Sequence, residues 1–430
     1  MGTNEADVGR KERASQAAAD HSPLTSGDGI EPVADGVWLL KGQGRSFVVE
    51  IDEGLVVVDA GPGGSVTAGM IEHLRGVSAR PVVALCYSHG HGGYNVGVPM
   101  WLDDAAKRGH PRPRVIAHAN VPARYARYRR TAGLQNRINE LQFRRAAGGM
   151  RSMMQLTDPG ETYTERLVIG DGARRVHLLW APSETDDVTA VWVPWARVLY
   201  GSASIISGIP NIGTPFRTMR DTLRWATTLE RLMDLRPVTV VREFGDVIVG
   251  DEDVQRVLGH TAGALRWLHA EVVRLMNEGR GERELLAEIV YPPEWFDVPW
   301  MSPNYGDPSY IVRDIYRSEN GWWDRNPTSL HPASPAAAGA EVAAAIADKA
   351  ALISHAETLA ARGEHQLALH VIDVLATAPG DAPEIVQARQ LKAAWLRERA
   401  EQVRSYVSRS IYLGCADRIE EGTAAEFGLR

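Results

Sequence analysis

The sequence predicts an α/β fold, a layered sandwich of sheets and helices, followed by an α-helical domain. In the first part of the chain, short apolar runs alternate with polar or helical stretches up to about residue 250. After residue 251 the pattern becomes mostly helical, and from Ala336 onward the chain is rich in alanine. Strands flanked by helices, with many hairpins between them, are typical of stacked sheets whose outer faces are covered by helices.

The elements of the first part can be placed in chain order. Runs rich in β-branched and aromatic residues, bounded by turn residues, predict strands. These runs cover residues 37–40, 46–51, 55–58, 81–85, 114–118, 175–180, 189–193, 196–200 and 238–241. Helical patterns cover residues 65–77, a basic stretch from 121 to about 145, and the amphipathic stretch 218–235.

The second part of the chain reads as helices separated by breakers. Helices are expected at 254–278, closed by Gly279, near 311–316, and at about 338–362, 364–377 and 383–402. The last three resemble helical hairpins of the tetratricopeptide type. Because only one or two such units are present, we expect their apolar face to pack on the first domain or on a second copy of the chain.

Four segments follow from these patterns. Residues 1–29 are polar and rich in Ala, Ser and Gly, without the apolar region of a signal peptide, so a disordered tail is expected. Residues 30–250 form the sandwich domain, 251–335 a helix and wrapping segment that complete it, and 336–430 the helical domain.

The composition of the chain indicates which partners it can bind and which cellular compartment suits it. The 430 residues are 44% hydrophobic and 23% charged, with net charge −7, which disfavours a nucleic-acid surface. No apolar run approaches the roughly 18 residues of a membrane-spanning helix. The two cysteines, Cys86 and Cys415, lie far apart and suit a reducing compartment. We therefore expect a cytoplasmic protein that binds neither nucleic acid nor membrane.

The most informative stretch is Ser-His-Gly-His-Gly-Gly-Tyr-Asn at residues 88–95. A strand that ends in His-x-His puts both imidazoles on one side of the backbone, and neutral imidazole is a common metal ligand. His89 and His91 are therefore candidate ligands. Two other readings stay open: a fold without metal, in which these histidines only form hydrogen bonds, and a glycine-rich phosphate loop. The phosphate-loop pattern fails at Asn95, where it requires glycine.

Several separate stretches resemble the alkylsulfatases of the metallo-β-lactamase superfamily. They lie at residues 54–59, 87–91, 211–214, 220–221, 274–279, 305–306, 321–327 and 412–414. The Gly-Trp-x-Asp-x-Asn-Pro element at 321–327 is specific to this family. The resemblance implies a metallo-β-lactamase αββα sandwich and a helical dimerisation domain, hence a homodimer. The family's C-terminal sterol-carrier-like domain is expected to be missing, which weakens the interpretation as a detergent hydrolase.

The resemblance also implies a metal site that this sequence only half retains. The superfamily signature His-x-His-x-Asp-His has Gly93 at the Asp position and Tyr94 at the last His position. A family glutamate corresponds to Glu184, our third ligand, and the family's last histidine falls near Glu243, a possible fourth. The position of a further family glutamate falls near Ser202, which is a poor ligand.

The retained donors predict one divalent ion held by two histidines and one or two carboxylates. Such a set suits zinc, iron or manganese, and the resemblance favours zinc. Tyr94 could bind a metal only as a phenolate, whose ordinary pKa is about 10, so we take it as a candidate catalytic residue. Two histidines and a carboxylate are also the arrangement of non-haem iron(II) enzymes.

The substrate-binding candidates are fewer and rest mainly on the resemblance. Asn211 and Thr214 match the stretch that approaches the sulfate in the family, and Arg217 could clamp an anionic group. Alternatively, Arg217 pairs with Asp221 on the surface. Tyr305 could line an apolar pocket or, alternatively, pack between the domains.

Three hypotheses of function follow. The first is a metal-dependent hydrolase resembling alkylsulfatases, with a single ion, acting on a small or amphiphilic anionic substrate. The second is a mononuclear non-haem iron enzyme of oxidative or rearrangement chemistry in a specialised biosynthetic pathway. The third is a non-catalytic binding protein derived from an enzyme.

Overall fold

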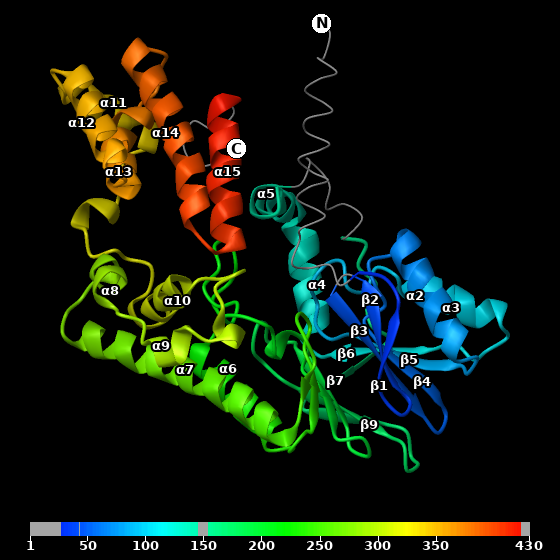
Figure 1. Ribbon diagram of the computed structural model, residues 1–430. Coiled ribbons are helices and arrows are strands. Elements are labelled where there is room, and N and C mark those ends of the chain that lie inside the picture. The colour runs from blue at the N-terminus through cyan, green and yellow to red at the C-terminus, as the bar shows by residue number, and fades with distance from the viewer. Residues whose placement is uncertain (1–26, 43, 145–153, 423–430) are drawn as a thin grey trace, which may run out of the picture.

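The computed structural model of the chain describes residues 27–42, 44–144 and 154–422. The disordered tail predicted for 1–29 lies almost entirely outside these ranges, as does the end of the basic helix predicted to reach residue 145. The predicted fold class is confirmed: two facing sheets lie between helices, and a helical region follows (Figure 1).

The first sheet contains seven strands in chain order. They are β1 (Ile30–Ala34), β2 (Val37–Gly42), β3 (Gly44–Ile51), β4 (Gly54–Val58), β5 (Val82–Cys86), β6 (Arg114–His118) and β7 (Glu161–Tyr163). Strands β1 to β4 pair antiparallel, whereas β4 to β7 pair in parallel. The parallel half brings the carboxyl ends of β4, β5 and β6 to one edge, where the loops that follow them can meet.

The second sheet has six strands in the order β13-β12-β11-β10-β9-β8. They are β8 (Arg166–Ile169), β9 (Val176–Trp180), β10 (Thr189–Val193), β11 (Val198–Tyr200), β12 (Thr239–Val241) and β13 (Ile248–Val249). Neighbours pair antiparallel except β11 and β12. Glu184 lies in the short connection between β9 and β10, and Glu243 lies just after β12.

Three apolar layers hold the sandwich together. Between the sheets, Phe47 stacks on Tyr200 with ring centroids 5.1 Å apart. Helices α2 (Gly64–Val77), α3 (Val98–Lys107) and α4 (Val121–Arg130) cover the outer face of the first sheet through Met70 and Trp101. Helices α6 (Thr222–Met233) and α7 (Asp251–Asn277) cover the second sheet through Trp225. Strand β4 is buried along its whole length because both faces of its sheet are covered.

The chain then crosses the second helical layer before it enters the helical region. Helices α8 (Glu282–Glu288), α9 (Pro293–Phe296) and α10 (Pro308–Asn320) follow α7, with short 3₁₀ turns η2 (Pro299–Met301) and η3 (Pro327–Ser329). Leu285 and Ile311 bury α8 and α10 in the same core as α6 and α7. The predicted division of the chain at residues 250 and 335 stays a prediction.

The last part of the chain forms a helical region with a core of its own. It contains α11 (Pro335–Ala345), α12 (Lys349–Ala361), α13 (His365–Ala376), α14 (Pro383–Gln402) and α15 (Tyr406–Glu420). Ile372 and Trp395 are among its buried core residues. The helices thus bury one another more than expected, and the predicted packing of this region on a second copy of the chain stays a prediction.

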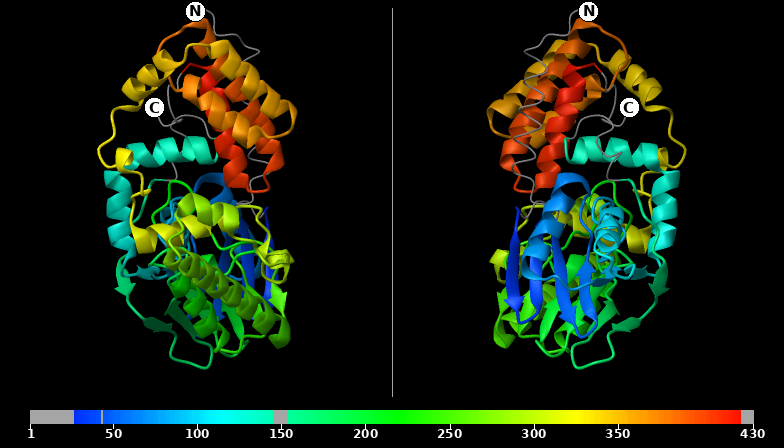
Figure 2. Two further views of the ribbon diagram at one scale, coloured as in Figure 1. Left: turned by 90° about the vertical axis from the view of Figure 1, so that its left-hand side faces the viewer. Right: turned by 90° about the vertical axis from the view of Figure 1, so that its right-hand side faces the viewer.

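The helical region meets the sandwich through α15 and α5 (Ala132–Gln142). Both views of Figure 2 show α15 at the lower end of the helical region, close to the sandwich. The contact is partly ionic, because Arg144 Nη2 lies 3.0 Å from an oxygen of Asp417.

Several boundaries differ from those predicted. The helix expected at 218 begins at Thr222, since the Asp221 side chain accepts a hydrogen bond from Arg224 N at 2.9 Å and caps the helix. The helix expected over 338–362 is two helices, because Asp348 caps α12 in the same way. The sequence patterns do not predict β1, β7, β8, β13, α3, α8, α9 or α15.

None of the helices in the described ranges combines the length and the apolar character that crossing a bilayer requires. The cytoplasmic location and the expected absence of nucleic-acid and membrane partners stay predictions.

Candidate metal centre

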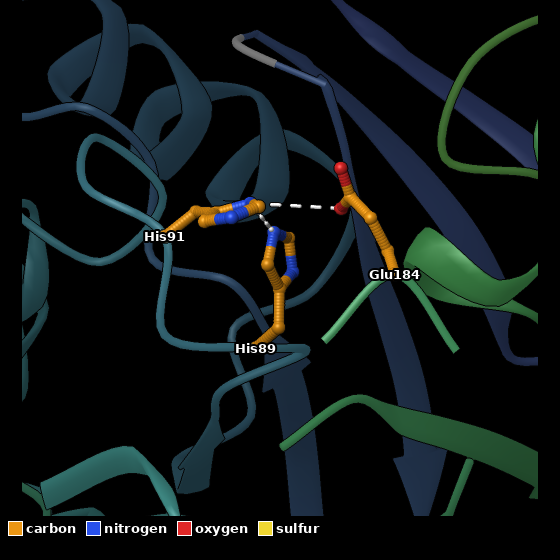
Figure 3. Close-up of side chains that lie close together, drawn as sticks. All are labelled: His89, His91 and Glu184. Carbon is orange, nitrogen blue, oxygen red and sulfur yellow. Dashed lines mark hydrogen bonds and ion pairs between the residues drawn. The ribbon is translucent and has the colours of Figure 1, made fainter. Parts of the chain in front are cut away.

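His89, His91 and Glu184 converge from two sheets (Figure 3). The two histidines lie on the loop that follows β5, at the edge where the parallel strands end. Glu184 reaches them from the connection between β9 and β10 in the other sheet. The site thus lies at the rim of the sandwich, and its parts are brought together only by the packing of the two sheets.

The donor atoms are close enough to share one cation. His89 Nε2 and His91 Nδ1 lie 2.8 Å apart, and Glu184 Oε2 lies 3.6 Å from His91 Nδ1. One donor atom from each of the three residues falls within 4.8 Å of the others. Ligands about 2.1 Å from a tetrahedral ion lie about 3.4 Å from one another. Two imidazole nitrogens and a carboxylate oxygen at these spacings therefore fit a single ion.

The electrostatic state of His91 also suits a ligand. Burial lowers the pKa of His91 well below its usual value, and the nearby charges of His89 and Arg124 lower it further. The ring is then neutral, the form in which imidazole binds metals. The His89 ring is oriented by Ser88, whose Oγ lies 2.8 Å from His89 Nδ1.

Asp59 holds the histidine loop from the end of β4. One oxygen of its buried carboxylate accepts hydrogen bonds from Ser88 N at 2.9 Å and from Asn95 Nδ2 at 3.0 Å. Asn95 in turn accepts a hydrogen bond from Ala60 N at 3.0 Å. Asp59 adopts a positive φ of 64°, which is uncommon for a residue other than glycine. It therefore fixes both ends of the loop from residue 88 to residue 95.

Asp187 holds the same loop from the second sheet. Its fully buried carboxylate accepts hydrogen bonds from Gly90 N at 3.2 Å, from Arg124 Nε at 2.7 Å and from the Thr185 hydroxyl. Burial alone would raise the pKa of Asp187, but the charge of Arg124 lowers this pKa below its usual value. A Cβ atom at position 90 would lie 2.7 Å from Asp187 Oδ2, so the approach requires glycine. The basic helix thus contributes an anchor for the loop.

The second oxygen of Glu184 is held by a cluster of polar side chains. Glu184 Oε1 accepts hydrogen bonds from Asn211 Nδ2 at 2.7 Å and from Arg220 Nη1 at 3.0 Å. The Thr214 hydroxyl donates to Asn211 Oδ1. Asn211 and Thr214, predicted to bind substrate, are therefore engaged with each other and with Glu184. Their contact with a substrate stays a prediction.

Tyr94 and Glu243 form a separate pair beside the three donors. The Tyr94 hydroxyl donates a hydrogen bond to the Glu243 carboxyl, and burial raises the pKa of both groups well above their usual values. The Tyr94 ring lies 4.6 Å from the His89 ring, between centroids. Glu243 lies outside the compact group of three donors, so its predicted role as a ligand stays a prediction.

Arg217 and Tyr305 lie near the three donors. The charge of Arg217 acts on both His91 and Tyr305, and it makes no ion pair with Asp221 or any other described residue. Burial raises the pKa of Tyr305 to about 12. Gln142 Nε2 donates to the Tyr305 hydroxyl at 2.9 Å. Arg217 and Tyr305 thus lie within electrostatic reach of the donors, and their contact with a substrate stays a prediction.

The helical region holds Tyr305 in place. The Tyr305 ring stacks on Tyr406, the first residue of α15, with centroids 6.2 Å apart. The Ser405 hydroxyl, at the cap of α15, donates to the Tyr305 carbonyl oxygen at 2.7 Å. The helical region therefore helps to build the wall of the site.

The sequence patterns miss four residues that shape this site: Arg124, Gln142, Asp187 and Arg220. Arg220 lies in the stretch 220–221 that resembles the family, but the predicted helix includes it, whereas the real helix begins after Asp221, so its contact with Glu184 is not predicted. Nothing in the sequence distinguishes Asp187 from its exposed neighbour Asp186. Gln142 gives no signal at all.

Comparisons with known proteins match two consecutive parts of the chain. Residues 39–244 match the family described as "Metallo-beta-lactamase superfamily", and residues 281–422 match "Alkyl sulfatase dimerisation". A "Linear primary-alkylsulfatase" from Pseudomonas sp. is 26% identical over 67% of this chain and 58% of its own length. An "(R)-specific secondary-alkylsulfatase" from Pseudomonas sp. is 23% identical over 87% of this chain and 60% of its own length.

The fold agrees with these matches. The structure of a stereoselective inverting sec-alkylsulfatase from Pseudomonas sp. superposes with a TM-score of 0.79 at 19% identity, covering 92% of this chain and 66% of that one. The chain thus spans about 60% of the length of the curated relatives.

Replacing Asp187 with alanine should destabilise the protein by about 3 kcal/mol, because Arg124 and Gly90 N lose a buried partner. Asp186→Ala is the matched control. Asp186 also pairs with Arg124, but its side chain is 51% exposed, so we expect a loss below about 1 kcal/mol. Urea unfolding of both variants would measure the difference. Equal losses would contradict the role of Asp187 as the anchor of the loop.

Proposed function

Because this chain belongs to the alkylsulfatase family of the metallo-β-lactamase superfamily, we propose that it is a hydrolase that uses a single metal ion. His89, His91 and Glu184 would hold the ion, and zinc is the metal favoured by the family, with iron or manganese possible. The observation that carries this proposal is the convergence of their three donor atoms within 4.8 Å.

The positions at which this chain differs from the superfamily signature support one ion rather than two. Gly93 has no side chain to offer. The Tyr94 hydroxyl and the Glu243 carboxyl are hydrogen-bonded to each other, and burial raises the pKa of both groups, which disfavours their anionic forms. Ser202, near the position of another family carboxylate, is buried and uncharged. This donor set does not fit a second cation, and no part of the proposed reaction depends on one.

The charges around the donors favour an anionic substrate. Arg124, Arg217 and Arg220 all lie near enough to His91 to lower its pKa. Two of them are paired with buried carboxylates, which leaves Arg217 to bind an incoming anion. The Tyr305 ring, which stacks on Tyr406, would offer an apolar surface to the organic part of the substrate. The relatives are named for alkyl sulfates, so a small or amphiphilic sulfate ester is the first substrate class to test.

The ion, when bound, would supply Lewis acidity and lower the pKa of a water molecule, the default chemistry of such hydrolases. The residues of the chain orient the reactants. Asp59 and Asp187 fix the histidine loop, and Arg217 would hold the anionic group. The Tyr94 hydroxyl, beside His89, would turn its single proton from Glu243 to the reacting group when the substrate binds.

A second candidate function follows from the same three donors. Two histidines and one carboxylate are also the ligand set of non-haem iron(II) enzymes that handle oxygen. An iron enzyme of oxidative or rearrangement chemistry is therefore the alternative, and the metal content of the purified protein separates the two.

Protein purified without added metal should contain about one zinc ion per chain and should release sulfate from dodecyl sulfate. His89→Ala should lose most of the metal and the activity, because it removes one of three ligands. Elemental analysis and a sulfate assay on both proteins measure this. One iron per chain would favour the alternative function, and two zinc ions or none would contradict the proposal. Bound zinc without sulfate release would indicate another hydrolase substrate.

Tyr94→Phe should lower kcat by about 100-fold, the usual scale for losing a catalytic hydrogen-bond donor or acid, while the metal content stays the same. Tyr87→Phe is the control, because the Tyr87 hydroxyl donates to Thr157 O at 2.9 Å, away from the donors. Steady-state kinetics of both variants test the assignment. An unchanged kcat in Tyr94→Phe would mean that the ring only packs against His89.

We also propose that the protein is a homodimer, joined through the region that matches the dimerisation family. Large apolar side chains in this region are exposed, namely Val290, Trp322, Leu330, Val342, Leu367 and Val386. Light scattering at micromolar concentration should give about twice the 47.1 kDa of one chain. A mass of one chain, unchanged over a tenfold rise in concentration, would contradict the dimer.

A further inference from the structure

A buried arginine sits directly behind the third metal ligand. Arg220 is only 4% exposed, and its Nη1 donates to Glu184 Oε1 at 3.0 Å. Asn211 Nδ2 donates to the same oxygen. The other oxygen, Oε2, is the one that faces His91. Building on the proposed function, we propose that Arg220 is a positioning residue that occupies one oxygen of Glu184 and thereby directs the other toward the metal.

Arg220 can do this because it is itself fixed from several sides. Its backbone N donates to Asp314 Oδ2 on α10 at 2.8 Å, and its Nη1 also donates to the carbonyl oxygen of Asn211. The helix cap at Asp221 starts α6 immediately after it, which keeps Arg220 out of the helix. A guanidinium offers several donors in a rigid plane, so it can bind two acceptors without turning.

Arg220 has two opposite effects on the affinity for a bound cation, and replacing Arg220 shows which of them is larger. As a positive charge in a buried site, Arg220 repels a cation, so its removal would strengthen metal binding if charge alone mattered. As an anchor, it keeps Glu184 from rotating away, so its removal would weaken metal binding. Losing a residue that orients a metal ligand usually weakens metal binding by about 10- to 100-fold.

The site provides a matched control in Arg217. It carries the same charge, acts on the same His91, and makes no ion pair with Glu184 or any other described residue. Replacing Arg217 removes a positive charge near the donors without releasing Glu184. Arg217→Gln should therefore bind metal as tightly as the wild-type protein, or more tightly.

The experiment measures zinc and cobalt(II) affinity by competition with a chelator, together with the visible spectrum of the cobalt(II) protein. Arg220→Gln should bind both metals roughly 10- to 100-fold more weakly. At saturating cobalt, its spectrum should shift toward that of Glu184→Gln, because both changes remove the carboxylate from its place. Arg220→Lys, which keeps the charge but loses the planar donors, should lie between Arg220→Gln and the wild type, and decides the question if Arg220→Gln does not fold.

Unchanged or tighter metal binding by Arg220→Gln, with the wild-type cobalt spectrum, would overturn the proposal. If Arg220→Gln does not fold, wild-type metal affinity and a wild-type cobalt spectrum in Arg220→Lys would overturn it. Equal weakening in Arg220→Gln and Arg217→Gln would also overturn it, since the effect would not pass through Glu184. These results leave the proposed function standing if the wild-type protein binds one ion. A wild-type protein that binds no metal would overturn both.

Discussion

The site depends on one constraint: the carboxylate of Glu184 is held out of water between a guanidinium and two imidazoles. A buried carboxylate without a partner is costly, and breaking a buried ion pair typically costs several kcal/mol. Arg220 and Asn211 satisfy one oxygen at 3.0 and 2.7 Å, so the other can face His91. The contact also joins the two sheets, because Glu184 and the histidines come from opposite layers. The geometry of the three donors therefore depends on the packing of the two sheets.

Under the proposed function, the same rim explains why the chain would hold one ion rather than two. Where a second ion would need ligands, a tyrosine and a glutamate bind each other instead. Their hydrogen bond satisfies two buried polar groups without a cation, which suits a site that holds one ion. The hairpin at Gly44 closes over this pair, since a Cβ atom there would lie 3.0 Å from the Tyr94 ring. The pair of Tyr94 and Glu243 is thus packed closely against the first sheet.

Much of the fold could be predicted from local patterns, and part of the site as well. The strands before Asp59 and His89 are continuous apolar runs, and their order gave the sandwich and the two histidines. Glu184 came from the resemblance to alkylsulfatases, with no local signal of its own. Arg220 and Asp187 escaped because their roles depend on contacts with residues 36 and 97 positions away. The family-like stretch at 220–221 singled out Arg220, but a helix predicted to begin four residues too early placed it inside the helix and gave no reason to expect its contact with Glu184.

The central claim is that one ion lies between His89, His91 and Glu184, while Tyr94 and Glu243 bind each other. A crystal structure of the zinc-loaded protein, with anomalous differences measured at the zinc edge, tests it most directly. The account predicts a single anomalous peak within bonding distance of all three donors, with the hydrogen bond between Tyr94 and Glu243 intact. Two neighbouring peaks, or a peak bound to the Tyr94 oxygen, would contradict it.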